Sequence, residues 1–445
     1  MMRRRRKQLP TGSQVALVHT LSHEGRGIAQ IEGKTTFIHN ALPGEKVEFT
    51  YTFCSRSYDE GIATQALEMS EHRVKPTCPH YVVCGGCQLQ HMSMDLQLSH
   101  KQKVLLEQLA HFGNVIPKQI LPALSGKPLQ YRNKARLGVR YVDKKGQRVL
   151  VGFRERNGRY LADMDECVVL HPSVGQKIPE LSALVHKLSG YEHIPQIEVA
   201  IGGDQTAILL RHMTPLTSED LQHLDDFSQK HNMHIYSHPN PPGKITKLFP
   251  NDGIERLHYV LPKHNLEMLF HPSDFTQVNE EMNQLMLDRA LELLNPQADE
   301  TILDLFCGIG NFTLAIARYA KQVVGVEGAE TAVQRAYENA AHNNIQNVEF
   351  FTADLSKDCT QMPWMQRKYD KILLDPSRAG ADGILAALPS LEAHTIVYVS
   401  CNPATLSRDA GILVNQLGYT LESAGIMNMF PHTAHMESIA LFTKA

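Results

Sequence analysis

From about residue 280 onward, segments of helical character alternate with short apolar segments that are typical of buried strands. The strand segments are TILDLF, QVVGVE, NVEFFT, YDKILL and TIVYVS. Strands that alternate with helices form a parallel sheet covered on both faces, because each crossover helix packs back onto the sheet. The sequence therefore predicts an α/β domain with a parallel sheet in the C-terminal part of the chain.

Acidic residues end or closely follow three of these strands, and a glycine-containing loop, CGIGN, follows the first strand. Ligands bind at the carboxyl edge of an open parallel sheet, where Glu327, Asp354 and Asp375 would lie. The loop lacks G-x-G-x-x-G and no P-loop lysine follows it, which disfavours a dinucleotide or a nucleoside triphosphate. By itself the loop also fits a tight turn in any doubly wound fold. We expect S-adenosylmethionine, with Glu327 accepting from its ribose hydroxyls and Asp354 near its adenine.

The segment TIVYVSCNPATLSRD places Cys401 directly after a strand, where the chain turns into a helix. Backbone N–H groups at a helix N-terminus carry partial positive charge, so we expect a lowered pKa for this thiol. A buried structural cysteine is the alternative, but the neighbours of Cys401 are polar and turn-like. Cys401 is therefore the predicted nucleophile, whereas Cys307 and Cys359 are interpreted as packing or surface residues.

A thiolate nucleophile narrows the class of reaction. Methyl transfer to nitrogen or oxygen needs no thiolate, but C5 of a pyrimidine is barely nucleophilic until a thiolate adds at C6. A base must then remove the C5 proton, and MNMFPHTAHMESIALF offers His432, His435 and Glu437. Glu437 lies among apolar residues that would raise its pKa, so it is the predicted base. A glutamate that merely starts a strand is the alternative.

Three further cysteines, Cys78, Cys84 and Cys87, lie in the segment CPHYVVCGGCQLQH. The sequence contains no apolar stretch long enough to span a membrane and no signal-peptide core, which predicts a cytoplasmic protein with reduced cysteines. Clustered reduced cysteines favour a metal site over disulfides. Zinc and iron–sulfur sites both usually take four ligands, so a fourth ligand is expected elsewhere in the chain.

At 445 residues the chain is too long for one ordinary core, and two or three domains are expected. Short glycine-punctuated strands between residues 13 and 68 predict a five-stranded barrel of OB type, a platform for single-stranded nucleic acid. Residues 125–270 are strand-rich and irregular. The N-terminal run MMRRRRKQ is interpreted as a solvated tail or an RNA-binding arm, and the segment at 131–148 as a strand with one basic face.

Together these motifs resemble those of the RNA uracil-5-methyltransferases along nearly the whole chain. They are the cysteine segment, FTQVN (275–279), DLFCGIGNFTL (304–314), LDPSRAG (374–380), VSCNPATLSRD (399–409) and FPHTAHMES (430–438). The cysteine segment points to the iron–sulfur branch of the family, which methylates a uridine in bacterial 23S ribosomal RNA. The resemblance implies methyl transfer from S-adenosylmethionine to C5 of a specific uridine, through a covalent Cys–uracil C6 adduct.

The resemblance also implies a role for each matching residue. Cys401 matches the nucleophile and Glu437 the base. Cys167 stands where the family carries its fourth ligand, which implies a [4Fe–4S] cluster, although four thiolates alone would also accept zinc. The implied cluster ligands are Cys78, Cys84, Cys87 and Cys167, and the implied cofactor and target-base site consists of Gln277, Phe306, Asn311, Glu327, Asp354 and Asp375.

The implied fold is a multidomain α/β protein. It comprises an OB-like (TRAM) barrel at residues 10–70, a central α+β iron–sulfur domain at 71–92 and 125–270, and a class I (Rossmann-like) methyltransferase domain at 93–124 and 271–445. A monomer that binds a single-stranded or flipped-out uridine of 23S ribosomal RNA, without membrane contact, is expected. Two alternatives stay open: a transfer-RNA uracil-5-methyltransferase, and a non-catalytic RNA-binding protein that retains a methyltransferase fold.

Overall fold

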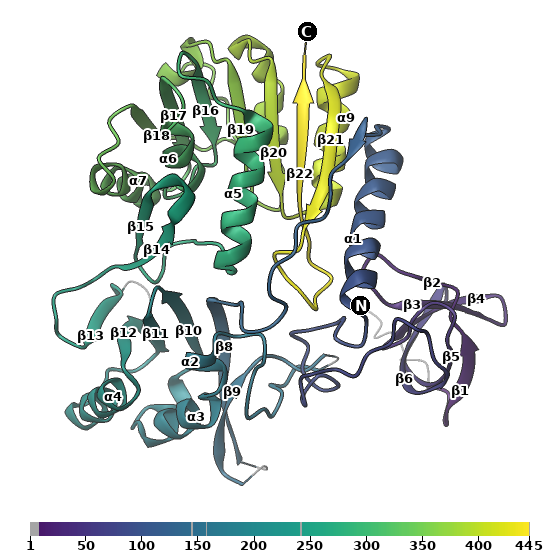
Figure 1. Cartoon of the computed structure of the whole chain (residues 1–445). Coiled ribbons are helices and arrows are strands. Elements are labelled where there is room, and N and C mark those ends of the chain that lie inside the picture. Colours follow the sequence, from purple (N-terminus) through teal and green to yellow (C-terminus); the bar gives the residue numbers. More distant parts are fainter. Residues whose placement is uncertain (1–8, 144–145, 157, 241–242, 445) are drawn as a thin grey trace, which may run out of the picture.

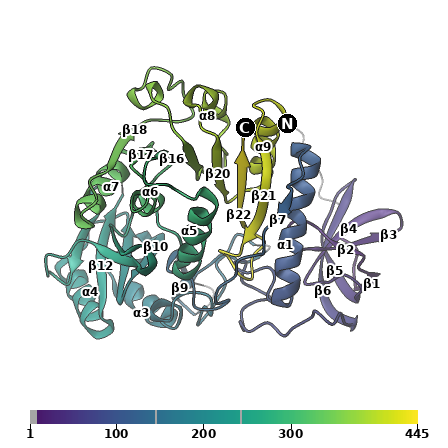
Figure 2. The ribbon, with the colours of Figure 1, turned by 45° about the horizontal axis from the view of Figure 1, so that its top comes forward.

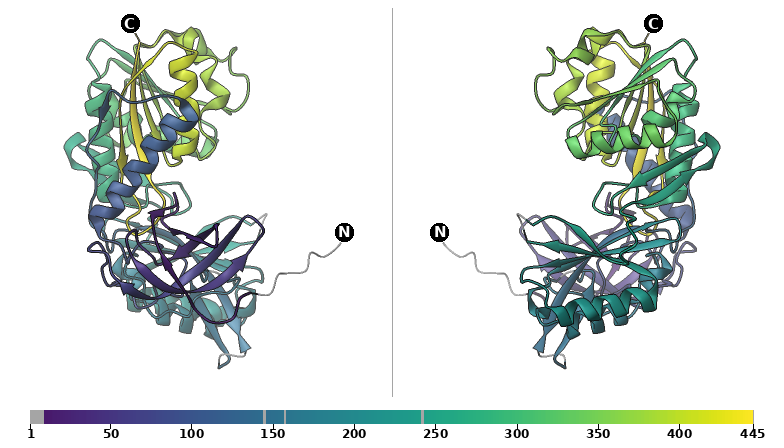
Figure 3. Two further views of the ribbon diagram at one scale, coloured as in Figure 1. Left: turned by 90° about the vertical axis from the view of Figure 1, so that its right-hand side faces the viewer. Right: turned by 90° about the vertical axis from the view of Figure 1, so that its left-hand side faces the viewer.

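The computed structural model describes residues 9–143, 146–156, 158–240 and 243–444. The chain forms an N-terminal barrel, a central mixed sheet with helices, and a larger C-terminal sheet (Figure 1). Side views place the barrel and the central sheet at one end of the molecule and the C-terminal sheet at the other (Figure 3). The arginine run at residues 3–6 lies outside the described residues. Within the described part, no helix is long and apolar enough to cross a membrane.

The N-terminal barrel has the strand order β1-β5-β6-β4-β3-β2. Residues 14–21 form both edge strands of this sheet. At one edge β1 (Gln14–Leu17) pairs with β5 (Lys46–Cys54), and at the other β2 (Thr20–Leu21) pairs with β3 (Gly27–Ile31). The other strands are β4 (Lys34–His39) and β6 (Tyr58–Glu68). The five predicted strands thus become six, since the first one bends and divides in order to pair with both edges.

A mixed sheet of order β13-β12-β11-β10-β8-β9 forms the central part. Its strands are β8 (Lys134–Val142), β9 (Arg148–Gly152), β10 (Gln196–Gly202), β11 (Gln205–His212), β12 (Met233–Pro239) and β13 (Thr246–Phe249). The predicted basic face of β8 is confirmed in part: Ala135 and Leu137 are buried and Arg136 and Arg140 are exposed, but Lys134 is half-buried.

The central part also contains helices, which were not predicted, because residues 125–270 were expected to be strand-rich and irregular. They are α2 (Pro172–Gly175), α3 (Ile178–Lys187) and α4 (Ser218–His231). α4 begins with a capping box, in which the Asp220 amide donates to Thr217 Oγ1 at 3.2 Å and the Thr217 amide donates to Asp220 Oδ2 at 2.9 Å. Leu224 and Phe227 lie on its buried face at helical spacing.

The C-terminal sheet has the order β18-β17-β16-β19-β20-β22-β21-β7. Its parallel strands are β16 (Thr301–Leu305), β17 (Gln322–Glu327), β18 (Val348–Thr352), β19 (Lys371–Leu374) and β20 (Thr395–Ser400). β22 (Glu437–Thr443) runs antiparallel between β20 and β21 (Thr420–Met427), and β7 (Gln119–Ile120) adds an edge. The five predicted strands are confirmed as parallel, and the antiparallel β22 makes the complete sheet mixed.

Helices cover both faces of this sheet (Figure 2). One face, which includes Ile302 and Val323, packs against α5 (Glu280–Leu294), α6 (Asn311–Ala317) and α7 (Glu330–His342). The opposite face, which includes Leu303 and Val324, packs against α1 (Met94–Gln108), α8 (Asp382–Leu385) and α9 (Pro403–Asn415). Neighbouring residues of one strand thus enter two separate cores, which explains why the strand segments are apolar throughout.

A hairpin of β14 (Leu257–Leu261) and β15 (Leu266–Phe270) precedes the C-terminal sheet. The amide of Leu269 donates to Asn339 Oδ1 at 2.8 Å, and Asn339 Nδ2 donates back to the Leu269 carbonyl at 3.1 Å. Met268 and Phe270 share the apolar core of α5 and α7. The hairpin therefore packs on the C-terminal helices and, in the same core, on Ala200 and Leu209 of the central sheet, so the boundary at residue 270 stays a prediction.

Candidate active site

The loop after β16 is shaped by left-handed backbone conformations. Phe306 (φ 67°), Gly308 (φ 54°) and Gly310 (φ 90°) all have positive φ. Glycine adopts such values without steric cost, whereas phenylalanine does so only where its surroundings hold it. The amide of Phe306 donates to the Val326 carbonyl at 2.8 Å, which fixes the loop beside the end of β17. The loop therefore lies at the carboxyl edge of the sheet, as predicted.

Glu327 ends β17 beside this loop. Its Oε2 accepts from the Gly308 amide at 3.2 Å, and its Oε1 accepts from the Ala329 amide at 3.0 Å. Each carboxylate oxygen has a second lone pair, so both can still accept a hydroxyl. The side chain is thus fixed in orientation while it keeps the capacity to bind a diol.

Asn311 is the first residue of α6, and its side chain is held by two neighbours. Asn311 Oδ1 accepts from Tyr259 Oη at 2.8 Å and from Asn283 Nδ2 at 3.1 Å. Asn311 Nδ2 in turn donates to Asn283 Oδ1 at 3.0 Å. The hairpin and α5 therefore position this predicted cofactor residue.

Asp354 follows β18 and makes its contacts within its own turn. Its Oδ1 accepts from the amide and the hydroxyl of Ser356, at 3.1 and 2.6 Å, and its Oδ2 lies 3.2 Å from Lys357 Nζ. The hydrogen bonds from Ser356 lower the pKa of this carboxyl. Asp354 is therefore an ionised, half-exposed acceptor at the rim of the edge.

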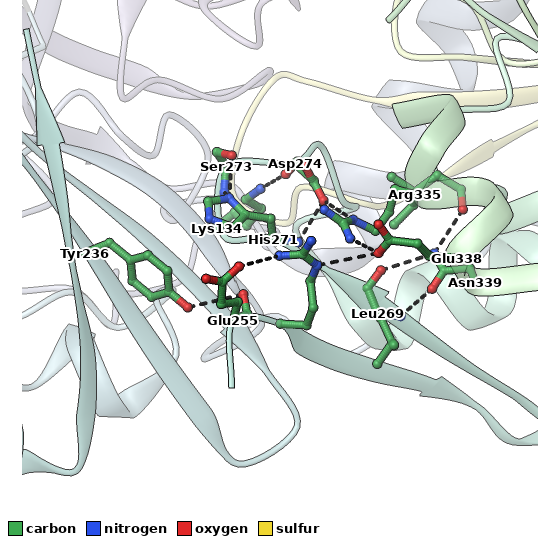
Figure 4. Close-up of polar contacts among 12 residues, drawn as sticks. Lys134, Tyr236, Glu255, Leu269, His271, Ser273, Asp274, Arg335, Glu338 and Asn339 are labelled. Atoms are coloured by element: carbon green, nitrogen blue, oxygen red, sulfur yellow. Dashed lines mark hydrogen bonds and ion pairs between the residues drawn. The ribbon is translucent and has the colours of Figure 1, made fainter. Parts of the chain in front are cut away.

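Gln277 is half-buried in the segment between β15 and α5, and Asp274 anchors that segment (Figure 4). Asp274 Oδ2 accepts from the His271 amide at 2.7 Å and from Arg335 Nε at 3.1 Å. Arg335 lies on α7, and Lys134 of β8 donates to the Asp274 carbonyl. The segment that carries Gln277 is therefore tied both to the C-terminal sheet and to the basic strand of the central part.

The pairing of β20 with β22 brings Cys401 and Glu437 together. Ser400 and Ser438 are register partners, so Cys401 leaves β20 beside the residue with which β22 begins. Cys401 is partly exposed, whereas Glu437 is 5% exposed. The structure thus places a thiol and a buried carboxyl from distant segments at one point of the sheet edge.

The predicted lowering of the Cys401 pKa is wrong in this structure. Burial raises the pKa of the Cys401 thiol to about 11, and the charges of Glu437 and Asp375 add to the shift. The N-terminus of α9 offers little compensation, because Pro403 has no N–H and the Ala404 amide donates to Asn402 Oδ1 at 3.2 Å. Only the guanidinium of Arg378 and a local backbone hydrogen bond act in the opposite direction.

Carboxyl groups at this edge also have raised pKa values. Burial raises the pKa of Asp375 to about 7 and that of Asp304 to about 8. Burial and the charge of Asp375 hold the pKa of Glu437 well above its ordinary value, in agreement with the predicted apolar setting of the base. Near neutral pH Asp375 and Asp304 are therefore poised between their neutral and ionised forms.

The four predicted cluster ligands, Cys78, Cys84, Cys87 and Cys167, line one small cavity. The Gly86 amide donates to Cys84 Sγ at 3.4 Å. The remaining lining is mostly apolar or aromatic and includes Tyr81, Phe153, Met164, Val168 and Val169. Among the described residues, no group of three or more histidine, cysteine, aspartate or glutamate side chains has the arrangement of a metal site. The thiols thus share a cavity without forming a compact ligand set.

Sequence reasoning missed three residues, of which one acts on the Cys401–Glu437 pair and two bind the segment that leads into Glu437. Arg378 lowers the pKa of both groups, and its position in LDPSRAG was the available signal. Gln97 and Lys101 are 0% and 1% exposed on α1, although both are polar. Two polar residues four apart on the buried face of an amphipathic helix were a readable signal for them.

His432 and His435, the alternative bases, have lowered pKa values. Burial lowers the pKa of His432 to about 4, and burial also lowers that of His435. A proton acceptor of such low basicity suits the removal of a C5 proton poorly. The geometry and the pKa values therefore favour Glu437.

Comparison with known proteins gives matches along the whole chain. A family profile described as tRNA (Uracil-5-)-methyltransferase matches residues 96–445, and a TRAM domain profile matches residues 13–63. The 23S rRNA (uracil(1939)-C(5))-methyltransferase of Hahella chejuensis is 54% identical over 450 residues, which cover 100% of both chains. The protein of the same description from Alcanivorax borkumensis is 51% identical and covers 100% of this chain and 99% of its own.

One solved structure resembles nearly the whole molecule. It is the tRNA (uracil-54, C5)-methyltransferase of Pyrococcus abyssi in complex with S-adenosyl-L-homocysteine, with a TM-score of 0.73 and 24% identity. The match covers 96% of this chain and 99% of that chain. At this level of identity the likeness establishes a shared fold.

Proposed function

This chain belongs to the family of 23S ribosomal RNA uracil-C5 methyltransferases, and we propose that Cys401 and Glu437 carry out the chemistry of that reaction. The protein transfers a methyl group from S-adenosylmethionine to C5 of a uridine in 23S ribosomal RNA. The observation that supports the residue assignment is the pairing of Ser400 with Ser438, which sets the thiol beside a buried carboxyl. A thiol and a base at one point are what methylation of C5 requires.

The two residues act in sequence on the target uracil. The Cys401 thiolate adds to C6, and the electron pair of the C5=C6 bond becomes available at C5 for the methyl group that S-adenosylmethionine would supply, with the neutral thioether as the leaving group. The Glu437 carboxylate then removes the C5 proton. The electron pair left behind re-forms the C5=C6 bond, the C6–S bond breaks, and Cys401 returns as a thiolate.

Both residues must ionise before they act, which the raised pKa values oppose. Positive charge at the edge favours the ionised forms of the thiol and the carboxyl alike. Arg378 supplies one such charge, and a sulfonium cofactor is itself a cation. The acidic edge therefore suits a cationic cofactor. The cation would favour ionisation of the thiol and the carboxyl, and their negative charges would favour binding of the cation.

We assign the cofactor to the edge around the loop after β16. Glu327 is proposed to accept from the ribose hydroxyls, since both of its oxygens are oriented and retain a free lone pair. Asp354 is proposed to accept from the adenine. The rest of the proposed cofactor and target-base site comprises Gln277, Phe306, Asn311 and Asp375.

We further propose that Cys78, Cys84, Cys87 and Cys167 hold a [4Fe–4S] cluster. The support is their common cavity, its mostly apolar lining and the Gly86 amide directed at Cys84 Sγ, which are the surroundings that thiolate clusters need. Zinc is the competing occupant. Iron and sulfide analysis of anaerobically purified protein decides between them: about four irons per chain and absorption near 400 nm are expected, and stoichiometric zinc would overturn the cluster.

We also propose a monomer in which the barrel and the central domain contact RNA while residues 93–124 and 271–445 hold the cofactor. The TRAM profile and the exposed basic face of β8 support this division. The alternative of a transfer-RNA substrate has the family profile's description in its favour, whereas the full-length relatives at 54% and 51% identity favour ribosomal RNA. The Cys401–Glu437 pair argues against a non-catalytic binding protein.

The decisive experiment offers purified protein two RNA fragments, one of 23S ribosomal RNA and one of transfer RNA, with labelled S-adenosylmethionine. We expect label only in 5-methyluridine of the ribosomal fragment. The same fragment carrying 5-fluorouridine at the target has no removable C5 proton, so a covalent protein–RNA complex should persist on denaturing gels. Methylation without any trapped complex would contradict the adduct, and label only in transfer RNA would contradict the substrate.

A further inference from the structure

The loop between β21 and β22, residues 428–436, leads directly into Glu437 and is held by side chains from distant parts of the chain. Tyr131 Oη donates to the Pro431 carbonyl at 3.0 Å. His432 adopts a left-handed conformation with φ 65°, which a non-glycine residue keeps only where its surroundings hold it. We call residues 428–436 the catalytic loop because they lead into Glu437. The conformation of this loop therefore depends on contacts from outside it.

Helix α1 holds the catalytic loop from one side. Lys101 Nζ donates to Asn428 Oδ1 at 2.8 Å and to the Phe430 carbonyl at 3.1 Å. One turn earlier on the same face, Gln97 Oε1 accepts from the His432 amide at 2.9 Å. Both side chains are almost fully buried, so these bonds form away from water, where an unpaired polar group is costly.

The end of the cysteine segment holds the loop from the other side. The amides of Gln88 and Leu89 both donate to the His432 carbonyl at 2.9 Å. Gln88 directly follows Cys87, and the Leu89 side chain is 0% exposed in a small apolar cluster with Leu42 and Met92. The two amides are therefore rigidly placed.

Gln97 joins these two supports. Its Nε2 donates to the Leu89 carbonyl at 3.1 Å and to the Met92 carbonyl at 2.8 Å, while its Oε1 accepts from His432. One buried amide thus connects the cysteine segment, α1 and the catalytic loop. Both N–H groups of this amide thus point to the end of the cysteine segment and the residue after its loop, and its oxygen points to the catalytic loop.

We propose that Gln97 is a positioning residue that couples the cysteine segment to Glu437, so that the order of that segment sets the rate of C5-proton removal. The inference rests on the proposed roles of Cys401 and Glu437. Cys401 follows β20 inside the sheet and does not depend on the catalytic loop for its position. Disturbing the bridge should therefore slow elimination while adduct formation continues.

The test compares Gln97→Ala with Gln102→Ala on the same helix. Gln102 Oε1 accepts from the Ile426 amide of β21 at 3.3 Å and so contacts the sheet instead of the catalytic loop. In single-turnover reactions with ordinary uridine RNA, Gln97→Ala should transfer the methyl group but release product about 10- to 100-fold more slowly, because small misplacement of a catalytic group has effects of this size. A covalent complex should accumulate on denaturing gels, and Gln102→Ala should show none.

Two further variants test the coupling in case Gln97→Ala does not fold. Gln97→Glu, if protonated, keeps one donor and one acceptor and should restore part of the release rate. Gln88→Ala removes the bond from the Ala434 amide to Gln88 Oε1 at 3.4 Å and the bond from Gln88 Nε2 to the Gly85 carbonyl at 2.7 Å. It keeps the Gln88 backbone amide that donates to the His432 carbonyl, so it should fold and accumulate a smaller amount of complex. If Gln97→Ala fails to fold, the Gln88→Ala result decides.

Release at the wild-type rate from both Gln97→Ala and Gln88→Ala would overturn the coupling, as would an equal loss of adduct formation and release in a folded variant. Failure of the proposed function has a different signature. In that case wild-type protein itself gives no covalent complex with 5-fluorouridine RNA, whatever the behaviour of the Gln97 variants.

Discussion

The carboxyl edge of the C-terminal sheet and the cysteine segment position their side chains by different means. At the sheet edge, Glu327 ends a strand and Asp375 and Cys401 each follow one, and the register of these strands with their neighbours fixes where they end. The cysteine segment, between β6 and α1, contains no helix and no strand, and forms only isolated β-bridges. It is held by individual bonds, such as those from Tyr81 Oη to the Gln88 carbonyl and from Arg156 Nη2 to the Cys87 carbonyl at 2.7 Å.

This difference has a consequence for how each region fails. A side chain on a cooperative sheet can be replaced while the sheet keeps the remaining site in place. A segment held by single contacts loses order when one of them is removed, because few other interactions restrain it. Substitutions at the sheet edge should therefore change chemistry more than stability, and substitutions in the cysteine segment should do the reverse.

The largest effect is expected for Cys401→Ala, which removes the nucleophile and nothing that supports the sheet. Methylation should fall below detection, at least about 1,000-fold, while S-adenosylmethionine binding by calorimetry and the melting temperature stay near wild type. Cys359→Ala, at a buried cysteine of the same part of the chain, is the matched control and should keep its activity. Methyl transfer by Cys401→Ala at a near-normal rate would exclude the thiolate mechanism.

Glu437→Gln should act at the same edge but at a later step. The amide cannot accept the C5 proton, so the thiolate still adds, the methyl group is still transferred, and elimination stalls. Denaturing gels should show a stable complex with ordinary uridine RNA, and turnover should drop by about 100-fold or more. Free turnover without any complex would mean that a different group removes the proton.

Cys167→Ser tests the region of the cysteine segment. If the four cysteines hold one cluster, they close a loop of about ninety residues, for which chain-entropy arithmetic gives about 4.6 kcal/mol of stabilisation. We expect lost iron, a markedly lower unfolding midpoint and weaker RNA binding, with S-adenosylmethionine binding retained. Cys359→Ser provides the control for replacing a buried cysteine. Loss of cofactor binding together with RNA binding would show that the two regions are not separable.

Lowering the pH should destabilise the folded conformation around the cysteine segment before it destabilises the C-terminal sheet. Burial lowers the pKa of His39 and His432 to about 4 and that of His91 to about 3. Between the ordinary histidine pKa of about 6.5 and these values the unfolded chain binds more protons, so stability is complete above about 6.5 and falls as pH decreases. Each histidine contributes at most about 1.4 kcal/mol per pH unit.

Hydrogen exchange at pH 7.5 and pH 5.5 measures this loss segment by segment. Faster exchange at pH 5.5 is expected first in residues 70–93 and in the catalytic loop, after correction for the intrinsic pH dependence. His432→Asn tolerates the left-handed conformation and removes one titrating group, so it should reduce the effect. Uniform loss of protection across the C-terminal sheet would contradict the assignment of the acid sensitivity to the histidines around the cysteine segment.

The sequence predicted the sheet edge well because strand segments and their end residues follow local rules. TILDLF and TIVYVS are apolar over a strand's length, and parallel strands bring their ends to one edge. The pKa of Cys401 was predicted with the wrong sign, since Pro403 and Asn402 remove the N–H groups on which the argument depended and burial outweighs the rest. The roles of the cysteines came from resemblance, because spacing alone does not distinguish zinc from an iron–sulfur cluster.

The helices of the central part and the bridge at Gln97 were not predicted, for different reasons. α3 and α4 carry helical periodicity that was outweighed by the surrounding strand segments. The contact of Gln97 with His432 joins residues 335 positions apart, and no local pattern encodes a pairing at that distance.

The place of α1 in the chain also bears on how the protein is synthesised. Val104 and Leu105 of α1 pack in the same core as Ile426 and Phe442, which leave the ribosome some three hundred residues later. During that interval the apolar face of the helix has no native partner, and the long separation makes its docking a late, slow event. The nascent chain therefore presents this helix to chaperones throughout the synthesis of the central part, and release before β22 is complete would leave an exposed, aggregation-prone surface.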